Sequence, residues 1–392
     1  ATRAHHADIG GITPGSMPAE SQHIEEEGVL IDDFLLAKSG QFRELEVREL
    51  LASGSFPARN ADQNVADLQA QVAANAYGLG ELQNLVRHYG GHVVSAYMQH
   101  IQDNAEEAVR RVIVKLHDGS FEYAMDNGAL VKVAVRIDQQ TSRMCIDFSG
   151  TSAQLPGNFN APAAVSRAAV LYVIRTLVNE TIPLNAGCLR PVDIIIPAGS
   201  MLNPVYPAAV VAGNVETSQY VADALYGALG VLSGSQGTMN NLTFGNEKYQ
   251  YYETVCGGAG AGDGFAGASA VQVHMTNSRL TDAEILELRF PVMLESFSIR
   301  HGSGGEGRYP GGDGVVRKLR FLEPMRVSIL SGHRRVPAFG LQGGSNGMPG
   351  ENSVTENNSV EQIQASACSF TVNTGDVLML ATPGGGGYGK AL

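Results

Sequence analysis

The sequence predicts an α+β fold in which mixed or antiparallel sheets are covered by a helical layer and joined by glycine-rich loops. Three observations support this prediction. A helical block fills residues 61–115, strand-like alternation begins only after it, near residue 131, and later helical stretches follow no fixed order among the strands. A doubly wound parallel sheet needs regular strand–helix alternation, so the pattern argues against that class.

The helical block contains three apolar faces, which are the signature of amphipathic helices. They are formed by Val65, Leu68 and Val72, then by Leu82, Leu85 and Val86, and finally by Val94, Tyr97, Ile101, Ala105, Ala108 and Val112. Gly90-Gly91 separates the last two faces. Because short glycine turns between amphipathic helices favour antiparallel packing, we expect a helical hairpin layer over a sheet.

The sheet region begins where Val131, Val133, Val135 and Ile137 alternate with other residues. Further strands are expected at 144–148, 192–196, 270–275, 315–321, 327–330 and 377–380, and helices at 163–178, 218–232 and 282–288. We treat residues 1–392 as one domain, subdivided into a loop plus helical layer at 1–125 and a mixed sheet region at 126–392.

Composition restricts the class of protein. The chain has 392 residues, of which 44% are hydrophobic and 17% charged, which is ample for a large core. A net charge of −12 argues against nucleic acid or an anionic membrane as partner. The sequence contains no run of about 18 or more apolar residues, the length needed to span a bilayer. The four cysteines form no Cys-x-x-Cys pair. We therefore expect a cytoplasmic protein.

The densest cluster of potential metal ligands lies near the first residue, where His5, His6 and Asp8 stand beside a loop of glycines and prolines. Imidazole and carboxylate together suit a divalent metal such as Zn²⁺ or Mn²⁺, which can generate hydroxide from water. His6 shares a strand face with Asp8, whereas His5 shares a face with it on a helical turn. A further ligand must come from elsewhere, and the alternative is a His and an Asp that only brace the loop.

Glycine is abundant, at 47 residues, and it clusters in short segments such as 257–262 and 384–387. Successive amides in such loops can bind an anion, so Gly258 and Gly260 are candidates for contacts to a phosphorylated substrate. The alternative is that each cluster only forms turns between strands. No glycine motif for nucleotide binding is present, so any ATP must bind to another chain or domain.

Five other residues are candidates for chemistry. Glu216, at the expected start of a helix, Glu253 and His274 are candidate general acids or bases, while Arg59 and Asn214 are candidates for binding the substrate. Each has a structural alternative, because an acid at a helix start often caps it and a lone histidine is usually a satisfied structural group.

The chain resembles the hydantoinase B family, which includes the carboxy-terminal half of 5-oxoprolinase and is related to subunits of acetone and acetophenone carboxylases. The matching segments run in the same order along nearly the whole chain: the first loop, 67–75, 147–151, 157–162, 213–219 and 382–389. The amino-acid sequence of residues 10–18, 251–254 and 274–277 is most similar to that of the 5-oxoprolinase branch.

The resemblance implies an ATP-dependent opening of a cyclic amide, with 5-oxoproline converted to glutamate. A hydantoinase A-like partner binds ATP and Mg²⁺ and converts the carbonyl oxygen into a phosphate ester, so a hetero-oligomer is expected. This component then hydrolyses the activated ring. The family pattern His-x-x-Asp favours His5 and Asp8 as metal ligands, with His6 in support.

The resemblance also implies an upstream segment with a second His-x-x-Asp pair. Residue 1 is an alanine, so we expect a fragment, a processed product or part of a longer polypeptide. Three alternatives stay open: a hydantoin or caprolactam hydrolase subunit, an acetone carboxylase-like subunit, and a non-catalytic scaffold for the ATP-binding partner.

Overall fold

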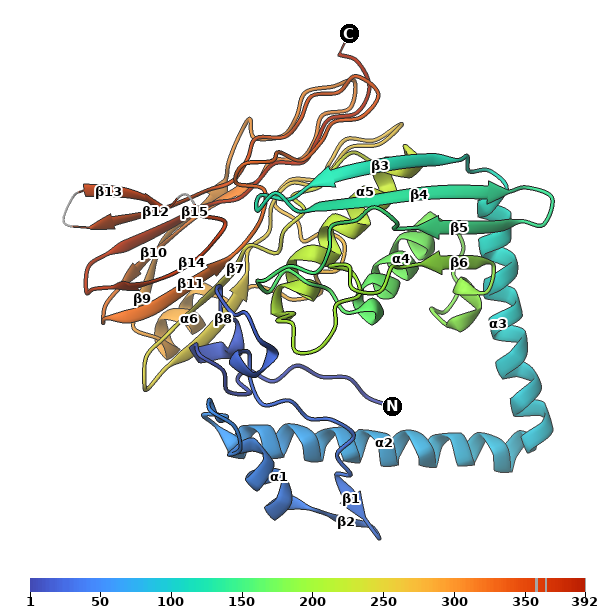
Figure 1. Cartoon of the computed structure of the whole chain (residues 1–392), viewed down its shortest axis with the longest axis horizontal. Helices are drawn as coiled ribbons and strands as arrows, with labels where there is room; N and C mark the ends of the chain where they lie inside the picture. The colour runs from blue at the N-terminus through green and yellow to red at the C-terminus, as the bar shows by residue number, and fades with distance from the viewer. Residues whose placement is uncertain (357–358, 364, 392) are drawn as a thin grey trace.

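The structure is a computed structural model that describes residues 1–356, 359–363 and 365–391. Its main body has two parts that lie side by side (Figure 1). One is a four-stranded sheet with helices against it, and the other consists of two further sheets that enclose a second core. The mixture of helices with antiparallel and mixed sheets confirms the predicted α+β class.

The first sheet has the strand order β3-β4-β5-β6, with β3, β4 and β5 antiparallel and β6 parallel to β5. Alternate residues Val131, Val133 and Val135 of β4 are buried, as the period-two pattern of a half-covered strand requires. Helices α3, α4 and α5 contribute to this core. The bounds are β3 Gly119–Ala124, β4 Leu130–Asp138, β5 Arg143–Asp147, β6 Val192–Ile195, α3 Gly91–Ile113, α4 Ala163–Leu177 and α5 Ser218–Leu229.

The other two sheets have the orders β13-β12-β15-β10-β9 and β14-β11-β7-β8. Buried side chains from both, including Phe244 and Phe321, form one core between them. The bounds are β7 Asn241–Gly245, β8 Gln250–Thr254, β9 Val292–Ile299, β10 Val315–Phe321, β11 Met325–Leu330, β12 Glu351–Glu356, β13 Ser359–Ile363, β14 Ala367–Val372 and β15 Val377–Ala381, with helix α6 Ala283–Arg289 before β9.

Most expected elements of the sheet region are present, but the strand at 270–275 was a wrong prediction. There, Val271 only bridges Gly257, and Ala270 and His274 have φ of 56° and 49°, which no extended strand accommodates. Strands β3, β7, β8, β9, β12, β13 and β14 and helix α1 (Glu44–Leu51) were not predicted.

The helical hairpin layer was also a wrong prediction. Residues 61–89 form one helix, α2 (Ala61–Tyr89), in place of two. Gly90, with φ of 84°, ends it, and α3 leaves the joint in another direction, so the two helices do not lie along each other (Figure 1). The first turns of α2 pack with α1, near the short strands β1 (Ala37–Lys38) and β2 (Gln41–Phe42). Within the described residues, no helix combines the length and apolar character needed to cross a membrane.

The glycine clusters pack against one another as extended segments that lie side by side near the C-terminus (Figure 1). Their backbones are joined by hydrogen bonds, such as those from the Gly385 amide to the Gly312 carbonyl and from the Gly312 amide to the Ala259 carbonyl, each 2.9 Å. A Cβ on Gly385 would lie 2.0 Å from the Ala259 carbonyl oxygen. Glycine is therefore required here by close approach of backbones, and we call this region the glycine bundle.

We predict that Gly385→Ala lowers the free energy of unfolding by about 2–4 kcal/mol, because neighbouring backbone must move to admit the methyl group. Gly157→Ala is the control, since a Cβ there meets nothing within 4 Å, and it changes stability by less than about 0.5 kcal/mol. Denaturant unfolding of both variants measures the difference. Equal stabilities would contradict the close packing of the bundle.

Candidate functional site

Two of the three predicted metal ligands, His5 and His6, border a cavity of about 460 Å³, which we call the His5 cavity, whereas Asp8 is not part of its wall. It lies between the first loop and four later segments. Its wall is formed by Ala4, His5, His6, Ala7, Ile9, Gly15, Ser16, Met17, Asn214, Val215, Met239, Tyr252, Met275, Asn277 and Ser278. Polar groups thus face apolar side chains across a space suited to a small ring.

The first loop is closed around the carboxylate of Asp8, which is buried. One carboxylate oxygen accepts hydrogen bonds from the amides of Gly10 and Arg59, at 2.9 and 3.2 Å, and the other from the Gly15 amide at 3.0 Å and from Arg59 Nη1 at 2.8 Å. Gly10 and Gly15 have φ of 96° and 80°, so the loop bends sharply enough for both amides to point inward.

Arg59 therefore acts within the loop. Its second guanidinium nitrogen also donates to the Gly11 carbonyl at 2.6 Å, so the group joins the carboxylate to the backbone it encloses. Arg59 is not part of the His5 cavity wall, and the structure gives the predicted substrate-binding role no geometric support. The two histidines differ: His6 pairs with Asp67 at 3.2 Å, while both imidazoles border the cavity.

Glu216 lies directly behind the wall of the His5 cavity. It belongs to a π-helical turn, Gly213–Thr217, that leads into α5, and it is fully buried. Its Oε1 accepts hydrogen bonds from Thr238 Oγ1, the Met239 amide and Asn241 Nδ2, at 2.8, 3.1 and 2.7 Å. Burial raises the pKa of this carboxyl well above its usual range, against the lowering effect of these hydrogen bonds.

The carboxyl of Glu216 is connected to the cavity through two side chains. Asn241 donates to Glu216 and accepts a 2.7 Å hydrogen bond from the hydroxyl of Tyr252, which borders the cavity. Burial raises the pKa of the Tyr252 phenol, so the hydroxyl keeps its proton. Because that proton is directed to Asn241, the lone pairs of the phenol oxygen are left for a ligand donor.

Glu253 has a different environment from the one predicted. Its carboxylate makes a two-bond ion pair with Arg317, at 2.8 and 3.0 Å, and both side chains are only 1% exposed. The pair joins β8 to β10, which belong to different sheets. Glu253 does not border the His5 cavity, so its position favours a structural role over the predicted acid–base one.

His274 also lies behind the cavity wall, next to Met275. Its Nε2 is 2.7 Å from Asp223 Oδ1, and its side chain is buried. Its predicted role as a general base requires reach to the substrate, which this buried pair does not provide.

The glycine amides predicted to bind the substrate are used inside the glycine bundle. The Gly258 amide donates to the Pro383 carbonyl and the Gly260 amide to Ser235 Oγ, both at 3.0 Å. Neither residue borders the His5 cavity. Asn214 does border it, as a candidate for substrate binding should.

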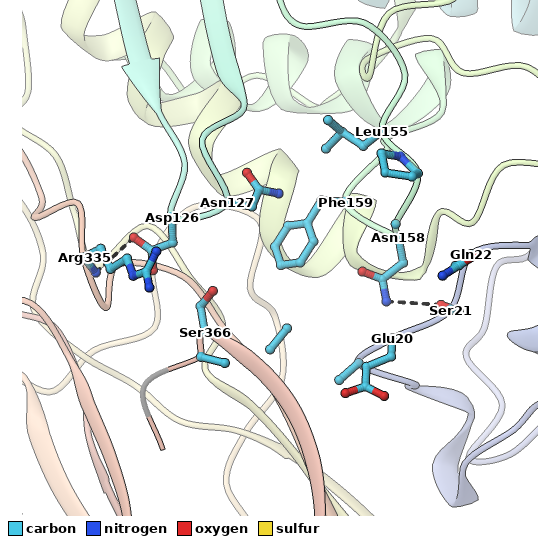
Figure 2. Close-up of a pocket in the computed structure, with 15 residues that line it drawn as sticks. Glu20, Ser21, Gln22, Asp126, Asn127, Leu155, Asn158, Phe159, Arg335 and Ser366 are labelled. Carbon is cyan, nitrogen blue, oxygen red and sulfur yellow. Dashed lines mark hydrogen bonds between the residues drawn. The ribbon is translucent and has the colours of Figure 1, made fainter. Parts of the chain in front are cut away.

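A second cavity of about 490 Å³ lies between Asp126 and Arg335 on one side and Asn158, Ser21 and Glu20 on the other (Figure 2). The Asp126 carboxylate accepts hydrogen bonds from the amides of Arg334, Arg335 and Val336, which fixes that side. The cavity includes no residue singled out as a site candidate.

Residues 1–391 match the family model described as hydantoinase B/oxoprolinase. This chain belongs to that family. It is 46% identical over its full length to a 5-oxoprolinase of Dictyostelium discoideum and 44% identical to 5-oxoprolinase 1 of Arabidopsis thaliana. The chain spans 31% and 33% of those two proteins, about one third of the curated relatives that it matches first.

The fold of this hydantoinase B/oxoprolinase chain is also that of a solved enzyme. The ATP-dependent caprolactamase of Pseudomonas jessenii has a TM-score of 0.84 and 25% identity, and the match covers 98% of this chain and 71% of the caprolactamase chain.

The predicted metal ligands do not fit a divalent cation by themselves. Such a site needs at least three protein ligands, and in the described ranges no three side chains of His, Cys, Asp and Glu gather closely enough. Both oxygens of Asp8 already accept hydrogen bonds, one of them from a cationic group.

Several cavity residues were not singled out as site candidates from the sequence: Tyr252, Met239, Asn277 and Ser278. One signal was present for Tyr252. Successive side chains of a strand point to opposite faces, so on β8 Tyr252 and Glu253 cannot serve the same side. The structure places Tyr252 at the cavity wall and Glu253 in the ion pair with Arg317.

The raised pKa of Glu216 predicts a pH dependence of stability. An acid whose folded-state pKa exceeds its ordinary value of 4.5 takes up a proton on folding, so the native state loses stability as the pH rises above that value. In Glu216→Gln this dependence is absent. We expect the stability of the wild type relative to this variant to fall as the pH rises above about 4.5, by up to about 1.4 kcal/mol per pH unit.

Unfolding in denaturant at several pH values measures this difference. Glu107→Gln, at a carboxylate that is 60% exposed, is the control and should leave a pH profile parallel to the wild type. A Glu216→Gln profile that is also parallel would show that Glu216 is ionised in the folded protein.

Proposed function

We propose that this chain is the ring-opening component of an ATP-dependent cyclic amide hydrolase, with 5-oxoproline as substrate and glutamate as product. The observation that carries the proposal is the 46% identity over the full chain to a protein named 5-oxoprolinase. The caprolactamase, with 25% identity, supports the same reaction class for a larger lactam. The proposal places ATP and Mg²⁺ on a hydantoinase A-like partner, in line with relatives about three times as long as this chain.

The chemistry needs two stages. An unstrained lactam resists water because amide resonance stabilises it, and conversion of its carbonyl oxygen to a phosphate ester removes that resonance. In the proposal, the ATP-binding partner performs this activation. Water then adds to the activated carbon, and the ring C–N bond breaks as the nitrogen takes up a proton, which leaves an aminoacyl phosphate. A second water hydrolyses this acyl phosphate to the amino acid and phosphate.

The residues of this chain bind and orient the ring. Asn214, Asn277, Ser278 and the two histidines supply polar groups, while Met17, Met239 and Met275 face the apolar carbons and exclude water. Tyr252, whose oxygen can accept a hydrogen bond, takes the ring N–H of the lactam before it is activated. Glu216 positions Tyr252 through Asn241 and makes no contact with substrate in this scheme.

A divalent Zn²⁺ or Mn²⁺ with His5, His6 and Asp8 among its ligands stays a prediction. Metal content by mass spectrometry, compared between the wild type and His5→Ala, tests it without any activity measurement. Stoichiometric metal that falls in the variant supports the prediction, and equal content in both contradicts it.

The reaction is tested by mixing the chain with its ATP-binding partner and following phosphate and glutamate release from 5-oxoproline. We expect release only when both components are present. Hydantoin and ε-caprolactam are tested in the same assay. If either ring is opened in preference to 5-oxoproline, it becomes the proposed substrate, and the proposed reaction class stays the same. Full turnover by the partner alone would make this chain a scaffold and overturn the proposal.

The role of Tyr252 gives a sharper prediction. Tyr252→Phe removes the phenol oxygen and should raise KM for the lactam about tenfold, the effect of losing about 1.4 kcal/mol of binding. ATP binding by the partner should not change. Tyr249→Phe, on the same hairpin but outside the cavity wall, is the control and should leave KM unaltered. An unchanged KM in Tyr252→Phe would remove Tyr252 from the binding site.

A further inference from the structure

The first turns of helix α2 hold the first loop in place. Asn64 and Asp67 are three residues apart and share one face of the helix. Asn64 is buried, and its Nδ2 donates a 2.8 Å hydrogen bond to the Asp8 carbonyl. Asp67 Oδ2 lies 3.2 Å from His6 Nδ1. Asp67 also begins one of the segments singled out in the sequence, 67–75, to which no role has been given so far.

The carboxylate of Asp67 is itself held by a neighbour. Its Oδ1 accepts a 2.8 Å hydrogen bond from Gln63 Nε2, one turn earlier on the same helix, which leaves Oδ2 for His6. The side chains of His6 and Asp67 are 17% and 29% exposed, whereas that of Asp62, in an ion pair with Arg48, is 86% exposed. The His6–Asp67 pair is therefore better shielded from solvent than this surface pair.

This contact decides which nitrogen of His6 is available to a ligand. An ionised carboxylate can only accept a hydrogen bond, so Nδ1 carries the hydrogen that is shared with Asp67. In a neutral imidazole Nε2 then has the free lone pair. His6 borders the His5 cavity, and across the described ranges its Nε2 accepts no hydrogen bond. The imidazole thus brings to the cavity an acceptor whose orientation is fixed by Asp67.

His5 is not fixed in this way. It also borders the cavity, but its side chain is exposed and forms no hydrogen bond or ion pair with the part of the chain that the structure describes. Water that adds to a carbon must direct an oxygen lone pair at it, and a fixed acceptor for one of its hydrogens sets that direction. Of the two imidazoles, only the one of His6 has a fixed orientation.

We propose that His6 Nε2 accepts a hydrogen bond from the water that adds to the activated ring, and that Asp67 is the positioning residue that orients His6. The inference rests on the proposed function, because it assigns a residue to the water of that reaction. His6 contacts the reacting water, whereas Asp67 acts only through His6. Both ring nitrogens of His6 are then occupied, so His6 is not a metal ligand in this scheme.

The sharpest test is Asp67→Asn, which keeps the size of the side chain. Because Gln63 donates to one oxygen of Asp67, the amide oxygen of the variant takes that bond and its NH₂ group faces His6 Nδ1. Nε2 then carries the hydrogen and can no longer accept one from water. With the ATP-binding partner present, kcat for ring opening should fall at least about tenfold, while KM for the lactam changes less than about twofold.

His6→Ala should lower kcat about 100-fold, again with little change in KM. Imidazole added in solution should restore part of this activity, because the cavity has room for it, and should leave the wild type unchanged. Asp62→Asn, at an exposed carboxylate of the same helix, is the matched control for Asp67→Asn and should keep the wild-type kcat and KM. ATP binding by the partner should be the same in all variants.

Circular dichroism and metal content by mass spectrometry are measured on the same variants, and both should match the wild type. An unchanged kcat in His6→Ala, or a raised KM with kcat unaltered, would overturn the inference and leave the proposed function standing. Metal lost in His6→Ala would also overturn it, since His6 would then be a ligand. A wild-type complex that opens no lactam would contradict the proposed function itself, and this inference with it.

Discussion

The closed first loop depends on one buried charge. The carboxylate of Asp8 is held by three backbone amides and the guanidinium of Arg59, and the loop has no large core of its own. An ionised carboxylate is stable in such a place only when its lone pairs are filled and its charge is balanced. The same contacts fix where Ser16 and Met17 stand, so the shape of the His5 cavity follows from the neutralisation of Asp8.

The opposite wall of the His5 cavity also has a buried acid behind it, Glu216, but this acid is stabilised differently from Asp8. No cationic side chain of the described residues is in hydrogen-bond contact with Glu216, and burial raises the pKa of its carboxyl, which favours the neutral form. Glu27 joins the two walls, because its carboxylate accepts hydrogen bonds from the amides of Val210 and Val211 and from Ser21. Buried acids therefore hold together segments that are far apart in sequence. The His5 cavity is the space that remains between these segments.

Sequence patterns gave the elements whose information is local. The alternation of β4 and the boundaries of α4, α5 and α6 follow from side-chain periodicity, and the glycine joint between α2 and α3 was visible as well. The direction of α3 was not predictable, because it depends on which half of each helix finds a core: α2 packs at its beginning and α3 from Ala105 onward. The missed β7 is buried throughout, so it lacks the alternation that identifies a half-covered strand.

The same limit applies to the candidate site: local sequence patterns were visible, and partners distant in the sequence were not. Residue types identified the first loop, Asn214 and Glu216 as neighbours of the cavity or its wall, since unusual polar residues beside glycines are visible in one dimension. Partner choice was not visible: Arg59 could equally pair with a ligand carboxylate or with Asp8, and Glu253 with a substrate or with Arg317.

In both cases the buried internal partner is present before any ligand arrives. A buried ion pair that loses one member costs about 3–5 kcal/mol, so a substrate carboxylate would have to supply that much to displace Asp8 from Arg59. Under the proposed function, recognition of the cyclic amide falls to groups that already border the cavity, among them Asn214, Tyr252, Asn277 and Ser278.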